Sequence, residues 1–185
     1  MKLWHPDWQV TALDISKDAV EVTAENARAL GAEVEIVQAD VLALSPHALN
    51  TREARRDNAD GTGSDNAVAN SSDNAVETGG YFDIVVSNPP YVCQSERKEM
   101  AHNVLDYEPS LALFVPDEDP LLFYRAITRH ASQVLRDGGQ LFFEVNARYA
   151  RETAQLLRNA AFSDVEVRRD MNGKERMVKG RKKES

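Results

Sequence analysis

Residues 81–92 read YFDIVVSNPPYV, an apolar run followed by an amide, two prolines and a tyrosine. The apolar part has the composition of a buried strand. Proline offers no N–H to a sheet ladder and favours extended geometry in the residue before it, so we expect the strand to end at Asn88. Ligands of open α/β sheets bind at the carboxyl ends of strands. The sequence therefore predicts a stiff loop that presents the Asn88 carboxamide to a ligand.

A strand, a helix and a second strand are predicted before this loop. WQVTALD (8–14) reads as a strand, Ser16 can cap a helix with apolar residues at helical spacing, and EVEIVQAD (33–40) alternates as a second strand does. The two strands end in Asp14 and Asp40. This pattern is typical of a βαβ unit with acids at its ligand edge.

The composition changes between residues 45 and 80 to Asn, Asp, Ser, Ala, Gly and Thr, and SDNAV occurs twice, at 64–68 and 72–76. Such a stretch has too few large apolar groups to offset its ordering entropy, so we interpret it as a disordered surface insertion. We therefore expect a partial cofactor-binding unit over 1–44, this insertion over 45–80, and the remainder of the same domain over 81–185.

Alternating strands and helices continue after the loop. Helices are predicted over about 120–136 and 148–160, with DGG (137–139) turning the chain into the strand QLFFEVN (140–146). Asn172-Gly173 is a two-residue turn signal within a terminal hairpin. The order indicates an α/β fold, a mostly parallel sheet with an antiparallel edge.

Composition and charge exclude several classes of protein. The 185 residues carry a formal charge of -8, and because the last 18 positions hold eight Lys or Arg against three acids, the rest is more acidic still. An acidic body argues against sequence-independent binding of nucleic acid. Cys93 is the only cysteine, which favours a reducing, cytoplasmic setting, and we expect it to pack rather than react. The histidines lack the spacing of metal ligands, and no apolar run is long enough to span a membrane.

Several motifs together resemble the peptide chain release factor glutamine methyltransferases, the HemK/PrmC family. The motifs that carry the resemblance, in order, are VTALDIS, VEIVQADVL, FDIVVSNPPYV, YEPSLALF, LRDGGQLFFEV and DMNGKERMVKGR. The resemblance implies a Rossmann-like class I methyltransferase fold, S-adenosylmethionine as the cofactor, and a release factor as the protein substrate. NPPY alone is shared with methyltransferases of DNA and RNA bases, so a nucleic-acid amino-methyltransferase stays as an alternative.

The residue types fit this chemistry. A glutamine side-chain nitrogen is a poor nucleophile, so a site must hold both of its N–H groups and aim the nitrogen at the methyl donor. The Asn88 oxygen can accept one N–H and the Pro89 carbonyl the other. The residues that the resemblance implies for catalysis are Asn88, Pro89, Pro90 and Tyr91; those for cofactor binding are Asp14, Ile15, Asp40, Val41 and Asn88. Neither a metal nor a general base is expected.

Two further residues of these motifs are expected to support the site without taking part in the reaction. Glu108 is expected to brace the substrate loop, and Glu144 to be a buried acid with a hydrogen-bond partner.

The family has a helical domain, a strand and a glycine-rich turn ahead of the first motif. We expect this chain to lack them, which would leave the first strand missing, expose strand edges that favour self-association, and weaken cofactor binding. An inactive fragment that serves as a binding module is the further alternative.

Overall fold

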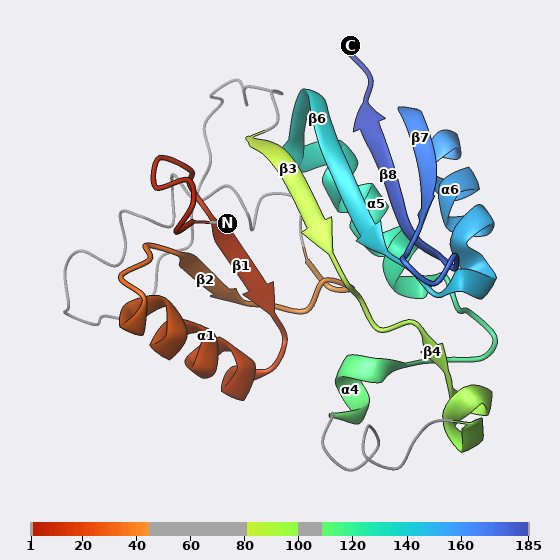
Figure 1. Ribbon diagram of the computed structural model, residues 1–185, viewed down its shortest axis with the longest axis horizontal. Helices are drawn as coiled ribbons and strands as arrows, with labels where there is room; N and C mark the ends of the chain where they lie inside the picture. Colours follow the sequence, from red (N-terminus) through yellow and green to blue (C-terminus); the bar gives the residue numbers. More distant parts are fainter. Residues whose placement is uncertain (1, 45–80, 100–108, 185) are drawn as a thin grey trace, which may run out of the picture. The chain divides into compact units, whose positions relative to one another are not determined.

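A computed structural model of the protein describes residues 2–44, 81–99 and 109–184 (Figure 1). These residues form two compact units, one of residues 2–44 and one of the later ranges. The predicted insertion at 45–80 and Glu108 lie outside the described residues.

The first unit is the predicted βαβ arrangement. Strands β1 (Thr11–Asp14) and β2 (Glu35–Gln38) pair in parallel, joined by helix α1 (Lys17–Ala29). The helix begins where the sequence predicts, because the Ser16 hydroxyl accepts a hydrogen bond from the Ala19 N–H at 3.3 Å. The connection places the carboxyl ends of both strands at one edge of the pair.

The second unit contains a four-stranded sheet in the order β3-β6-β8-β7. Its strands are β3 (Phe82–Ser87), β6 (Leu135–Glu144), β7 (Phe162–Arg169) and β8 (Glu175–Lys182). β3 and β6 are parallel, whereas β8 runs antiparallel to both β6 and β7. This confirms the predicted combination of parallel strands with an antiparallel C-terminal hairpin.

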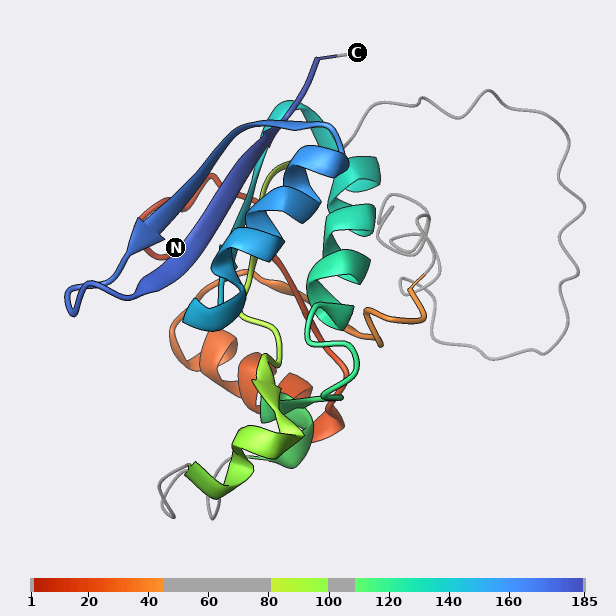
Figure 2. The same cartoon turned by 90° about the vertical axis from the view of Figure 1, so that its right-hand side faces the viewer.

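Two helices cover one face of this sheet, α5 (Leu122–Val134) and α6 (Ala150–Asn159) (Figures 1 and 2). Alternate residues of the chain through β6 turn toward them, and Leu141, Phe143 and Val145 are buried there. Tyr124 of α5 meets the Phe143 ring edge to face, with centroids 5.2 Å apart. The end of β6, where the candidate site begins, is therefore fixed to a packed core.

Short elements surround the loop after β3. Strand β4 (Val92–Cys93) pairs in parallel with β5 (Phe114–Val115). The remaining short helices are η2 (Gln94–Glu99), α4 (Ser110–Leu113) and η3 (Ala147–Tyr149). The predicted helical piece at 95–103 is a 3₁₀-helix over its described part.

Two turn predictions were wrong in detail. The DGG segment lies inside β6, where the register with β3 shifts between Phe82 and Ile84 and Gly138 takes a φ of 76°. It is a bulge within a longer strand, because a glycine at positive φ lets the chain bend without leaving the sheet. In the hairpin, the Asp170 N–H donates to the Lys174 carbonyl at 2.8 Å, which closes a three-residue loop, with Gly173 at a φ of 79°.

Among the described residues, no helix is both long and apolar enough to cross a membrane.

Candidate functional site

In the loop after β3, the Asn88 side chain is exposed to solvent. Asn88 is exposed and Pro89, directly after it, is buried. No described residue donates a hydrogen bond to the Asn88 carboxamide or accepts one from it, so both of its polar ends can meet a ligand. The two prolines fix φ on either side of the Pro89 carbonyl, and this limits how far that carbonyl can move.

Tyr91 is bound to the end of β6. Its hydroxyl donates to a Glu144 carboxylate oxygen at 3.1 Å, and the Tyr124 hydroxyl donates to the Glu144 backbone carbonyl at 3.3 Å. Burial, followed by the negative charge of Glu144, raises the pKa of the Tyr91 hydroxyl above 10.0, so it stays protonated and donates. Glu144 has the predicted hydrogen-bond partner, but the prediction that it is buried was wrong, because its side chain lies at the exposed end of the strand.

Asp14, Ile15, Asp40 and Val41 gather at the carboxyl edge of the β1–β2 pair. Asp14 is the last residue of β1, opposite Gln38, and the Ala39 N–H donates to the Asp14 carbonyl at 2.9 Å. Asp40 follows just after β2. The sequence therefore placed these residues correctly at one edge of the first unit, while the NPPY residues belong to the second.

The carboxylates at this edge fit a polyhydroxylated ligand. One oxygen of Asp14 accepts the Ser16 N–H at 2.8 Å, and one oxygen of Asp40 accepts the Leu42 N–H at 2.8 Å. Among the described residues nothing donates to the second oxygen of either carboxylate. Each carboxylate is thus oriented by the backbone N–H two residues further along the chain, and its second oxygen can accept a hydrogen bond from a hydroxyl or amino group.

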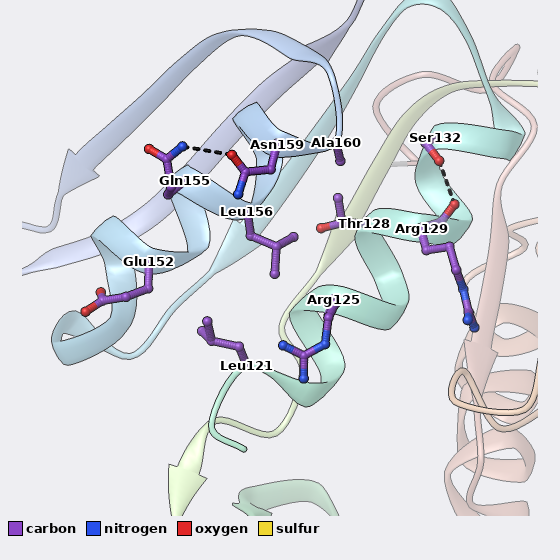
Figure 3. A pocket seen from close by; sticks show the side chains of 10 residues that line it. All are labelled: Leu121, Arg125, Thr128, Arg129, Ser132, Glu152, Gln155, Leu156, Asn159 and Ala160. Atoms are coloured by element: carbon purple, nitrogen blue, oxygen red, sulfur yellow. Dashed lines mark hydrogen bonds between the residues drawn. The ribbon is translucent and has the colours of Figure 1, made fainter. Parts of the chain in front are cut away.

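A groove of the second unit lies away from the NPPY loop. A groove of about 690 Å³ runs between α5 and α6, with Thr128 and Leu156 facing each other across it (Figure 3). None of the predicted site residues lines it. The described part of the chain also holds no group of three or more His, Cys, Asp or Glu side chains that could bind a metal ion.

Sequence reasoning missed two contacts of the NPPY loop. One is the bond between Glu144 and the Tyr91 hydroxyl, because the sequence did not indicate which residue Glu144 would bind. The other is the bond from the Asn146 side-chain amide to the Tyr91 backbone carbonyl at 3.2 Å. The two residues are more than 50 positions from the loop in sequence, and no local pattern relates them to it.

The chain is similar to known proteins in sequence. The family described as Eco57I restriction-modification methylase matches residues 9–172. The chain is 46% identical over 174 residues to the release factor glutamine methyltransferase of Flavobacterium psychrophilum, covering 94% of this chain and 50% of that protein. With the enzyme of the same name from Bacteroides thetaiotaomicron it shares 39% identity over 173 residues, covering 94% and 51% respectively.

The fold is also similar to a solved one. A crystal structure of a methyltransferase from Pyrococcus furiosus superimposes with a TM-score of 0.56 at 15% identity, covering 100% of this chain and 69% of that one. The chain spans about half the length of the curated relatives it matches. It has the class I methyltransferase fold, and it belongs to the family described as Eco57I restriction-modification methylase.

Proposed function

We propose that the whole protein is an S-adenosylmethionine-dependent methyltransferase that modifies a glutamine side-chain amide of a peptide chain release factor. The observation that carries this proposal is the NPPY loop, where the exposed Asn88 carboxamide stands beside the carbonyl of a buried proline. The names of the similar proteins favour a protein glutamine as the acceptor.

The loop has the hydrogen-bonding groups that a primary amide requires. The Asn88 side-chain oxygen accepts one N–H of the substrate glutamine, and the Pro89 carbonyl accepts the other. A nitrogen held at both hydrogens keeps its position and its orientation, and such alignment lowers the barrier without a strong base. Tyr91 supplies an aromatic wall, which the bond to Glu144 holds in place.

The cofactor is assigned to the edge of the first unit. S-adenosylmethionine supplies the electrophilic methyl group when it is bound. The free Asp14 oxygen accepts from the ribose hydroxyls, with Ile15 beside it, and Asp40 and the Val41 backbone meet the adenine. Carboxylates oriented by their own backbone N–H groups suit this task because they need no rearrangement to accept hydroxyl groups.

Methyl transfer to defined polymers tests the proposal. The complete protein is incubated with S-adenosylmethionine and release factor, DNA or RNA, and mass spectrometry locates the methyl group. We expect it on a glutamine of the release factor. A methyl group on DNA or RNA alone would replace this function with the nucleic-acid alternative.

The Asn88→Ala variant tests the role of the carboxamide. We expect turnover of the complete enzyme to fall roughly 10²–10³-fold, with little change in affinity for S-adenosylmethionine, because the lost group acts on the acceptor. Asn159→Ala is the matched control, since Asn159 is an exposed carboxamide of α6 that bonds only to Gln155 among the described residues. Unaltered turnover in Asn88→Ala would remove Asn88 from the mechanism.

A further inference from the structure

Residues at and just after the end of β6 form hydrogen bonds with the NPPY loop. Tyr91 is bound at two points there: its hydroxyl by the Glu144 carboxylate at 3.1 Å, and its backbone carbonyl by the Asn146 side-chain amide at 3.2 Å. Glu144 is the residue after Phe143, which is 2% exposed, and Asn146 lies two residues further along the chain. The loop is therefore hydrogen-bonded to a segment whose neighbours Phe143 and Val145 are buried in the core of the second unit.

The Asn146 carboxamide uses both of its ends. Its oxygen accepts the Arg148 N–H at 3.0 Å, which caps η3, and its nitrogen donates to the Tyr91 carbonyl and to a Glu96 carboxylate oxygen at 3.3 Å. The same Glu96 oxygen accepts the Cys93 N–H at 3.0 Å. One half-buried amide thus links three segments, the NPPY loop, η2 and the turn after β6.

The chemistry of this position is specific to asparagine. The carbonyl of Tyr91 and the carboxylate of Glu96 both require a donor, whereas the N–H of Arg148 requires an acceptor. Aspartate has the same shape but no donor, and glutamine is one carbon longer. The clamp, defined here as Asn146, Glu144 and Glu96, therefore depends on the amide nitrogen of Asn146.

We propose that Asn146 is a positioning residue for methyl transfer, which fixes the Tyr91 backbone and, through the two prolines before it, the Asn88 carboxamide and the Pro89 carbonyl. The proline rings fix φ at 89 and 90, so few torsions separate the anchored Tyr91 from the groups that grip the substrate amide. In this role Asn146 acts through the Tyr91 backbone, to which its side-chain amide donates. This inference rests on the function proposed above.

The Asn146→Asp variant removes only the donor. The aspartate keeps an oxygen for the Arg148 N–H, so the turn after β6 remains capped, but it places a second oxygen against the Tyr91 carbonyl and the Glu96 carboxylate. We expect the loop to open more often, because two hydrogen bonds are replaced by repulsion.

The single cysteine reports this opening directly. Cys93 lies two residues after Tyr91 and is 3% exposed, so a thiol reagent reaches it only when the segment opens. In the 185-residue chain we expect labelling of Cys93 to be roughly tenfold faster in Asn146→Asp than in the wild type. Ala154→Gly is the control, since it weakens α6 of the same unit without touching the clamp, and its labelling rate should stay close to that of the wild type.

Kinetics of the complete enzyme supply the second readout. We expect the turnover number of Asn146→Asp to fall roughly 10- to 100-fold because the acceptor is misplaced, while the KM for S-adenosylmethionine stays unchanged. Wild-type labelling and turnover in Asn146→Asp would overturn the clamp, and fast labelling with wild-type turnover would overturn its role in the reaction. If the wild type itself methylates no glutamine, the proposed function fails, and the labelling rates still decide whether the clamp exists.

Discussion

Tyr91 is hydrogen-bonded at both its side chain and its backbone. Its backbone carbonyl and its hydroxyl are bound by different residues of the chain after Phe143, and burial and Glu144 raise the pKa of the hydroxyl. A raised pKa means that folding favours the protonated form. The stability from this hydroxyl is therefore complete below pH 10.0, the ordinary value, and is lost as pH rises through the higher pKa of the folded state.

The Tyr91→Phe variant tests this assignment. We expect it to lower the free energy of unfolding by about 1 kcal/mol near neutral pH, since one hydrogen bond to a charged group is removed. Above pH 10 the difference should shrink, because only the wild type has this ionisable group. Urea unfolding at several pH values measures both effects. A difference that grows with alkaline pH would contradict the assignment.

The candidate site was predictable from sequence only where its residues are local. The position of Asn88 follows from an apolar strand that meets two prolines, and those of Asp14 and Asp40 follow from strand ends. Glu144 was expected to be buried because FFEV reads as an interior strand, yet it is the last residue of β6. Contacts such as Asn146 to Tyr91 arise from tertiary packing, which hydrophobic periodicity does not encode.

At the scale of elements, hydrophobic periodicity predicted the helices and most of the strands. It did not predict the conformation of the connections between them. The apolar stripe of α5 and the cap of α1 are local signals. The DGG segment reads as a turn because of its composition, but pairing with β3 holds it within a strand as a bulge. Register is decided by the partner strand, so a single strand's sequence does not reveal it.

The contact between β8 and α6 depends on a glycine. A Cβ added at Gly180 would lie 2.9 Å from a Leu157 methyl and 3.1 Å from the Phe162 Cβ. Because Leu157 is 0% exposed, its side chain has little room to move. Gly180→Ala should therefore destabilise the fold by about 1–3 kcal/mol in urea unfolding. The cost should fall in a Leu157→Ala background, and an equal cost in both backgrounds would show that packing is not the cause.

Glu166 links β7 to β8 through charge. The Lys179 and Arg168 side chains, at 3.1 and 3.0 Å, donate to its carboxylate and lower its pKa from 4.5. The stabilisation from a lowered pKa is present above 4.5 and is lost as pH falls through the folded-state value. We expect the thermal midpoint of the wild type to fall more steeply in acid than that of Glu166→Gln. Parallel curves would show that the ion pairs of Glu166 with Lys179 and Arg168 contribute nothing measurable to stability.

At the scale of the whole molecule, burial is unequally shared between the two units. Helix α1 has no buried residue, and strands β1 and β2 have none either. In the second unit, Tyr124, Leu135 and Leu141 are all 0% exposed. A strand pair with one helix and little buried apolar surface is marginally stable by itself.

Hydrogen exchange followed by mass spectrometry tests both this difference and the cofactor assignment. In the 185-residue chain, we expect amides of α1, β1 and β2 to exchange orders of magnitude faster than those of β6 and α5, because opening the first unit exposes little apolar surface. In the complete protein, saturating S-adenosylmethionine should slow exchange at 14–16 and 40–42. Adenosine alone should protect the same segments, since the contacts proposed there are to ribose and adenine. Protection confined to other segments would move the cofactor away from Asp14 and Asp40.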